Sequence, residues 1–310
     1  MPNFTLEVAT TEQHNLGEGP FWDEKRGILY YVDLFQGDLC KLNPDDKTVE
    51  KKHFGDETTT IVIPVENAED EFIVSCTKKI VQFNWRTDKI FELVEIEAGD
   101  GKTRVNDGKC DPKGRLWMGT MGLETAPAVV EPELGSLYRV NGPNKITKHF
   151  GNVTLSNGLA WSNDSKHMYF ADSVKRVIHV FDFDNQNGEI SNDRILFDYK
   201  ANPDVKTTEL PDGMTIDLEG KLWVANYNGG RIINIDPNTA QIIDKIDLPA
   251  AKITSLCFGG PNLNQFYITS AYKGLSDEER KQDPLAGSVF KITMDSVNIR
   301  GAINSRFVPQ

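Results

Sequence analysis

Four oxygen-bearing side chains, each followed by a glycine, recur along the chain and could together bind a cation. They are Glu18, Asp107, Asn157 and Asp212. An aromatic residue inside a strand-like run follows each of them, after 12, 10, 12 and 11 residues in that order. Carboxylate and amide oxygens suit Ca²⁺, Mg²⁺ or Mn²⁺ better than they suit a structural zinc ion, which prefers sulfur and imidazole.

Tight turns offer another explanation for these four pairs. Asp-Gly and Asn-Gly are common in turns, where the side chain accepts a backbone hydrogen bond. A tight turn is enough to explain any single pair. Four pairs in one register, with Glu in one of them, favour a metal site. Carboxylates brought together without basic residues raise one another's pKa and destabilise the fold unless a cation lies among them.

Arg104 and Asn106 precede one of the four residues and could contact a substrate. Two residues apart, they share one side of an extended segment and would place several donors beside the metal. Such donors suit a substrate rich in hydroxyl groups or one carrying a carboxylate. A surface arginine paired with a nearby acid would explain the same spacing.

A repeated element must position these side chains. Two degenerate copies of the pattern begin at Thr60 and Ser255. The strand-like runs are then centred at Tyr30, Ile73, Trp117, Tyr169, Trp223 and Tyr267, in steps of 43 to 54 residues. This period, with several short strands per unit, is typical of a β-propeller. We therefore expect an all-β fold of six four-stranded antiparallel blades. The first strand of each blade lines the central channel, so the polar residues should converge on the axis.

The blades can be divided into strands by alternation and by turn residues. In the third unit the expected strands are 108–111, 116–120, 136–140 and 146–150. The last unit has only three, at 255–258, 266–270 and 288–293. The segment 5–10 is strand-like, and we expect it to complete that blade and close the ring, which removes exposed sheet edges. The whole chain, 1–310, is then one propeller domain.

Two irregular segments stand out. The segment 275–283 has Ser276 and Glu279 at capping-box spacing and stops before Pro284, which predicts a short surface helix. The segment 122–134, with Pro127 and Pro132, lies between the second and third strands of unit three. Long connections at the face of a ring commonly shape binding sites, so we expect this segment to be a lid.

Composition limits the partners. The chain has 46 acidic and 34 basic residues, a formal net charge of −12, which disfavours binding to nucleic acid or to an anionic membrane. The first ten residues lack the features of a signal peptide, and no run has the roughly 20 apolar residues of a membrane span. We expect a soluble, cytoplasmic monomer. Four cysteines without CxxC spacing are expected to be buried thiols.

Several longer motifs resemble one enzyme family. They are GEGPFWD at 17–23, RVNDGKCDPKGRLWMGTM at 104–121, SNGLAWSND at 156–164, LPDGMTID at 210–217, GKLWVANYNGGR at 220–231 and FGGPNL at 258–263. Together they resemble regucalcin (senescence marker protein), the gluconolactonases and the beetle luciferin-regenerating enzymes. The resemblance spans the chain and implies a six-bladed propeller with one divalent metal ion in its channel.

The resemblance also implies roles for particular residues. Glu18, Asn157 and Asp212 correspond to metal ligands, with Asn106 close by. Arg104, Asn106 and Glu124 correspond to residues that hold a sugar lactone, and Asp212 is the candidate general base. Asp107 is not a ligand in that pattern and becomes a supporting or turn residue.

The activity implied by the resemblance is hydrolysis of sugar lactones, of the gluconolactonase type, with Ca²⁺, Zn²⁺, Mn²⁺ or Mg²⁺. The segment 124–130 resembles vertebrate regucalcins that act on aldonolactones, whereas Leu123 departs from the acidic residue expected there. Two alternatives stay open. One is a calcium-binding regulatory protein, and the other is a hydrolase of a non-sugar substrate, as in the luciferin-regenerating enzymes, for which a more apolar lid is expected.

Overall fold

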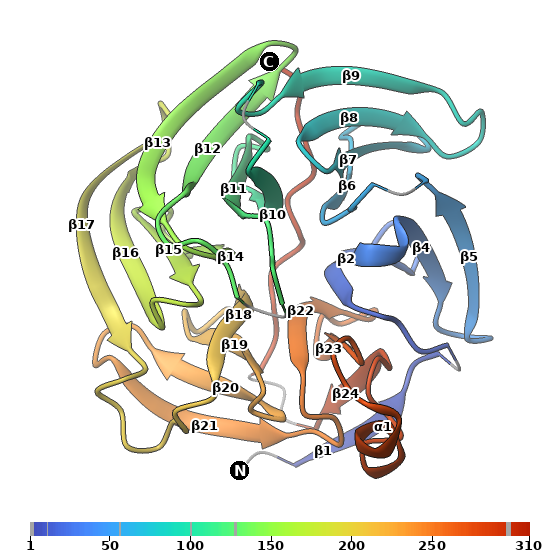
Figure 1. The fold of residues 1–310 in the computed structure, drawn as a ribbon, viewed down its shortest axis with the longest axis vertical. Coiled ribbons are helices and arrows are strands. Elements are labelled where there is room, and N and C mark those ends of the chain that lie inside the picture. Colours follow the sequence, from blue (N-terminus) through green and yellow to red (C-terminus); the bar gives the residue numbers. More distant parts are fainter. Residues whose placement is uncertain (1–2, 11, 56, 100, 127–128, 296–298) are drawn as a thin grey trace.

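The computed structural model describes residues 3–10, 12–55, 57–99, 101–126, 129–295 and 299–310. These residues form six four-stranded antiparallel sheets arranged around a centre (Figure 1). The all-β, six-bladed architecture predicted from the repeats is therefore confirmed. The inner strands are β2, β6, β10, β14, β18 and β22, and the sheets extend outwards from them.

Each blade is built from strands that follow one another in the chain, except at the closure. Blade one contains β2 (Gly17–Asp23), β3 (Ile28–Asp33), β4 (Asp38–Asn43) and β5 (Thr48–His53). Blade two contains β6 (Val62–Pro64), β7 (Glu71–Cys76), β8 (Lys79–Asn84) and β9 (Ile90–Glu95). Blade three contains β10 (Thr103–Cys110), β11 (Leu116–Gly122), β12 (Gly135–Gly142) and β13 (Lys145–Val153).

The remaining blades follow the same plan. Blade four contains β14 (Ser156–Trp161), β15 (His167–Asp172), β16 (Val177–Asp184) and β17 (Glu189–Asp198). Blade five contains β18 (Leu210–Ile216), β19 (Leu222–Tyr227), β20 (Arg231–Asp236) and β21 (Gln241–Asp247). Blade six contains β22 (Ile253–Gly259), β23 (Gln265–Ser270), β24 (Phe290–Met294) and β1 (Phe4–Val8).

The N-terminal strand closes the ring, as predicted. Strand β1 pairs antiparallel with β24, with Leu6 opposite Ile292, and supplies the fourth strand of blade six. Phe4, Leu6 and Val8 pack against the buried residues between blades five and six. Strand β24 therefore has a hydrogen-bonded partner instead of an open edge.

The recurring large residues of the second strands pack between blades. Trp117 and Trp223 are fully buried, and each indole N–H donates to an aspartate at the end of the preceding strand. The distance is 3.0 Å from Trp117 Nε1 to Asp111 and 2.9 Å from Trp223 Nε1 to Asp217. Burying such a ring contributes a few kcal/mol of stability only if its N–H finds a partner, and the aspartates provide it.

The inner strands begin earlier than the sequence suggests. In blade three β10 starts at Thr103, whereas the expected strand started at residue 108. The reason is a β-bulge, a register shift between Val105 and Gly108, which interrupts the alternation of side chains. The polar-Gly pairs therefore lie inside the inner strands and not at their entrance.

A C-terminal strap, residues 299–310, crosses the ring and was not predicted (Figure 1). Its backbone bonds to blades five, two and three in turn, through Leu218, Pro64 and Asn141 among others. Phe307 of the strap is buried in the core between blades two and three.

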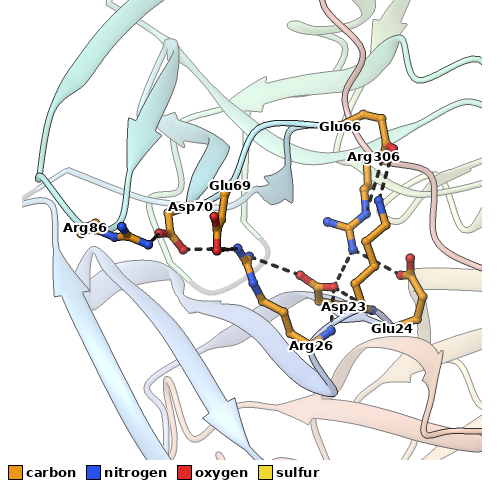
Figure 2. A network of polar contacts seen from close by, with 9 residues as sticks. Asp23, Glu24, Arg26, Glu66, Glu69, Asp70, Arg86 and Arg306 are labelled. Carbon is orange, nitrogen blue, oxygen red and sulfur yellow. Dashed lines mark hydrogen bonds and ion pairs between the residues drawn. The ribbon is translucent and has the colours of Figure 1, made fainter.

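Arg306 fixes the strap to the turns below blades one and two. Its guanidinium lies 2.5 Å from Asp23, 3.4 Å from Glu24 and 3.6 Å from Glu66. Figure 2 shows that this cluster continues through Arg26 to the acidic turn of blade two. Asp23 is buried, so its pairing with Arg306 matters more than a surface ion pair would.

The two irregular segments are a short helix and a connection between two strands. Helix α1 (Asp277–Gln282) has Ser276 as its N-cap and forms the predicted capping box with Glu279. The segment expected as a lid, 122–134, begins at the last residue of β11 and leads to β12; residues 127–128, including Pro127, lie outside the described part.

Among the described helices, none is long and apolar enough to span a membrane. All four cysteines are buried thiols.

Candidate metal and substrate site

Bulges at equivalent places in the inner strands position the candidate ligands. The register shifts between Glu18 and Phe21, Val105 and Gly108, Ser156 and Leu159, and Pro211 and Met214. A bulge leaves one residue unpaired and turns its side chain out of the regular alternation. The same local distortion in four blades therefore brings the polar residues to the channel.

The glycines that follow allow adjacent inner strands to approach each other. A Cβ atom on Gly158 would lie 2.5 Å from the carbonyl oxygen of Asp212, and one on Gly213 would overlap the side chain of Ser255. Gly19 has a φ of +55°, which favours glycine for a second reason. The glycine therefore allows the neighbouring strand to lie close, while the preceding residue carries the candidate functional group.

All six residues predicted for the site line one small pocket of about 50 Å³ in the channel. Glu18, Asn157 and Asp212 come from β2, β14 and β18. Arg104, Asn106 and Glu124 come from β10 and from the connection after β11. The rest of the lining is Leu16, Leu34, Met121, Leu155, Ser173, Leu210 and Tyr227.

Two buried oxygen atoms in this pocket, Oδ1 of Asn157 and Oδ1 of Asp212, have no hydrogen-bond partner among the residues that the structure describes. The amide of Asn157 is oriented by Ser173, because its Nδ2 donates to the Ser173 hydroxyl at 3.0 Å. That hydroxyl in turn donates to the Pro211 carbonyl at 2.6 Å. Glu18 lies beside them and accepts a bond from the N–H of Gly19 at 3.0 Å.

The carboxyl groups of the channel repel one another in this environment. Burial, with the charge of Asp107, raises the pKa of Glu18 to about 8. Burial, then the charges of Glu18 and Asp107, raise the pKa of Asp212 well above its usual range. Burial also raises the pKa of Asp107 to about 6. These groups cannot all be ionised at neutral pH unless a cation lies among them.

Glu18, Asn157 and Asp212 are suited to hold a divalent cation. Two orphaned oxygens and a raised glutamate pKa are what an oxygen-ligated ion would relieve. Over the described residues no group of three His, Cys, Asp or Glu side chains is arranged for a metal ion, and here the third oxygen would come from the amide of Asn157. Three ligands from Glu18, Asn157 and Asp212 would leave coordination positions of the ion open for water or substrate.

Arg104 and Asn106 lie on the same side of β10 and contact each other, as their spacing predicted. Arg104 Nη1 donates to Asn106 Oδ1 at 2.7 Å, and Arg104 Nη2 donates to Glu124 Oε2 at 3.1 Å. Asn106 Nδ2 donates to the carbonyl of Ser156 at 2.7 Å. Arg104 does pair with an acid, but it is buried and does not lie on the surface.

Asp107 lies on the other side of the bulges from the site. It lines a larger pocket of about 310 Å³, whose far wall includes residues 302–305 of the strap. It accepts a bond from the N–H of Gly108 at 2.7 Å, and nearby Lys109 donates to the carbonyl of Met214 at 2.8 Å. Asp107 therefore acts on the site only through its charge.

Sequence reasoning missed several residues at the site. Ser173 follows β15 and Tyr227 ends β19, and both line the pocket. Lys273 contacts Phe35, which is next to the lining residue Leu34, and the lining residue Glu124. Ser173 and Tyr227 stand just after the aromatic segments of their blades, which is a signal that could have found them. Phe35 and Lys273 have no counterpart in the repeat.

A family model described as "SMP-30/Gluconolactonase/LRE-like region" matches residues 16–272. The chain belongs to this family. The regucalcin of Xenopus laevis is 37% identical over 307 residues, which is 99% of each chain. The regucalcin of Oryctolagus cuniculus is 38% identical over 293 residues, 94% of this chain and 95% of the relative.

Solved structures of the family share the fold. A luciferin-regenerating enzyme superposes with a TM-score of 0.90 at 34% identity, covering 99% of this chain and all of the other. A regucalcin from Agrobacterium tumefaciens, described as a calcium-binding protein, gives a TM-score of 0.88 at 22% identity, covering 99% and 98%. Membership of the family supports a lactonase or a regucalcin role.

Proposed function

We propose that this chain is a divalent-metal-dependent hydrolase that opens the ring of sugar lactones. The observation that carries the proposal is the pair of unpartnered oxygens of Asn157 and Asp212 beside Glu18, in a pocket that also contains Arg104, Asn106 and Glu124. The residues proposed to hold a metal and those proposed to bind hydroxyl groups thus line one small pocket. The family includes gluconolactonases, which supports the choice of lactone.

We assign three of the pocket's side chains to the metal ion and three to the substrate. Glu18, Asn157 and Asp212 would hold Ca²⁺, Zn²⁺, Mn²⁺ or Mg²⁺, and the ion supplies polarisation of the lactone carbonyl and stabilisation of the oxyanion. Arg104, Asn106 and Glu124 bind and orient the ring hydroxyls through hydrogen bonds.

Asp212 is the proposed general base. Burial raises its pKa, and a cation bound beside it would offset this effect, so that the carboxylate stays ionised and can accept a proton from an attacking water. The apolar walls of the pocket, such as Leu155 and Leu210, limit competing solvent.

Two other functions have specific support. The pocket wall contains five leucine or methionine side chains, and Leu123 and Val129 of the lid are 47% and 54% exposed. Apolar surfaces of this kind favour a non-sugar substrate, as for the luciferin-regenerating relative. A calcium-binding regulatory role is favoured by the regucalcin relatives, and a bound ion that no lactone contacts would point to it.

Replacement of Asp212 tests the assignment of the base. We expect Asp212→Asn to lower kcat on gluconolactone at saturating metal by about 100-fold or more, the usual contribution of a general base. Metal binding is measured on the same samples by calorimetry. Asp247→Asn, an exposed aspartate at the end of β21, serves as the control. An undiminished rate in a metal-loaded Asp212→Asn protein would show that another group takes the proton.

A further inference from the structure

Three connections from different blades meet at the mouth of the pocket. Lys273, between β23 and α1, places its Nζ 2.9 Å from the ring centre of Phe35, which belongs to the short helix η1 (Leu34–Gln36). The same Nζ lies 3.6 Å from Glu124 Oε2. Glu124 and Leu34 both line the pocket, so Lys273 stands at its rim.

Two cationic side chains meet one carboxylate at this mouth. Arg104 and Lys273 approach the same oxygen of Glu124, at 3.1 and 3.6 Å. The Arg104 guanidinium is also 5.9 Å from the centre of the Phe35 ring. Two cations therefore flank one ring and share one carboxylate, which brings two positively charged donors together at the rim of the pocket.

A second lysine, Lys252, lies close by; burial lowers its pKa, and the acidic groups Glu279 and Asp283 oppose this effect. The Nζ of Lys252 donates to the carbonyl of Lys273 and lies 5.6 Å from the ring of Tyr227 in the pocket wall. Burial lowers the pKa of Lys273; Glu124 opposes this effect, and Arg104 and Lys252 add to it. An anion entering the mouth would therefore relieve repulsion between cations.

We propose that Lys273 is a specificity-determining residue that, together with Arg104, selects lactones carrying a free carboxylate away from the lactone carbonyl, the class of aldaric acid monolactones. This inference rests on the lactone hydrolysis proposed above. Arg104 and Lys273 already approach one carboxylate, that of Glu124, at 3.1 and 3.6 Å, so this pair of cations is arranged to accept a singly charged carboxylate. A carboxylate therefore fits better than a phosphate.

The test compares kcat/KM for glucaro-1,4-lactone, which carries a carboxylate, with that for neutral gluconolactone. For the wild-type protein the ratio of the two should exceed one. In Lys273→Gln the ratio should fall by about tenfold, the loss expected when one charged hydrogen bond is removed. Lys273→Arg should retain the ratio. Lys281→Gln on α1, 77% exposed, removes a charge of the same sign far from the pocket lining and should leave the ratio unchanged.

Other outcomes would overturn the proposal. A ratio at or below one in the wild type would exclude selection of carboxylates. A ratio unaltered by Lys273→Gln, with both rates reduced, would show that Lys273 only positions Glu124. A preference for 6-phosphogluconolactone would show that the mouth of the pocket selects a phosphate and not a carboxylate. Binding of both lactones is also measured by calorimetry; if no lactone is hydrolysed, the proposed function fails, whereas selective binding still decides the role of Lys273.

Discussion

Asn157 and Asp212 each keep a buried oxygen without a hydrogen-bond partner, and this makes the site costly in the absence of a cation. A buried unsatisfied polar group costs about 1–3 kcal/mol. The repulsion of Glu18 adds to this cost. Regions that trade stability for binding are typical of functional sites, and here a single divalent cation would satisfy both oxygens and remove the repulsion.

The raised pKa of Glu18 predicts how the chelated protein responds to pH. Its ordinary value is 4.5 and burial raises it to about 8, so the folded state holds this proton to higher pH than the unfolded state does. The associated stability is complete below pH 4.5 and is lost as pH rises towards 8. We expect the Tm of the chelated protein to fall over this range.

The variant Glu18→Gln isolates this effect, because it removes the titrating group. Its Tm in chelator should depend less on pH than that of the wild type, and Ca²⁺ should raise its Tm less at pH 8. Glu278→Gln on α1, 79% exposed, should behave like the wild type. Thermal unfolding across pH 4.5–8 with equal slopes for wild type and Glu18→Gln would contradict the buried, repelled state of Glu18.

The residues that the sequence could identify are those that recur. Glu18, Asp107, Asn157 and Asp212 sit at equivalent bulges, so one repeated pattern gave all four, and only the family resemblance set Asp107 apart. Arg104 and Asn106 were found from their alternate spacing. Phe35 and Lys273 could not be found in this way, because each lies in a connection unlike those of the other blades and meets the site only through the closure of the ring.

At the scale of elements, the alternation of apolar and polar residues predicts a strand well where side chains alternate regularly between its two faces. Strand β11 begins at Leu116 and β20 spans Arg231–Asp236, as their patterns suggest. The bulge in β10 breaks the alternation, so the segment before Gly108 resembles a loop in sequence although it is paired. The strap has no periodic pattern at all, because its partners are the turns of several distant blades.

Phe307 allows the contribution of the strap to be measured. Its side chain is 1% exposed among the core residues of blades two and three. Phe307→Ala should lower the free energy of unfolding by about 3–5 kcal/mol, the usual cost of removing a buried phenylalanine. Urea unfolding provides the measurement. Val308→Ala, at a site 38% exposed, is the neighbouring control, and equal effects of the two changes would mean that the strap does not close the core.

At the scale of the whole molecule, the ring combines two opposite electrostatic regions. The chain carries a net charge of −12, yet Arg104, Lys252 and Lys273 surround the mouth of the pocket. Glu18 and Asp212 also line the pocket. These acidic groups and the net charge would attract a divalent cation, whereas the basic groups would attract the proposed anionic or hydroxyl-rich substrate.

The ring also explains why residues far apart in the chain form a single site. Four of the inner strands, β2, β10, β14 and β18, each supply one or two groups, and the ring brings these strands to a common pocket. The repeat could therefore predict the architecture and the direction of the ligands. It could not predict the dimensions of the pocket, which depend on side chains such as Leu34, Met121 and Tyr227 from connections and strand ends.

The central claim is that the pocket hydrolyses sugar lactones with the help of one divalent cation. It is tested most directly by treating the wild-type protein with chelator, adding back Ca²⁺, Zn²⁺, Mn²⁺ or Mg²⁺ separately, and measuring hydrolysis of a panel of aldonolactones. We predict loss of activity in chelator and recovery that depends on the ion added. Full activity in chelator, or no activity with any of the four ions, would contradict the claim.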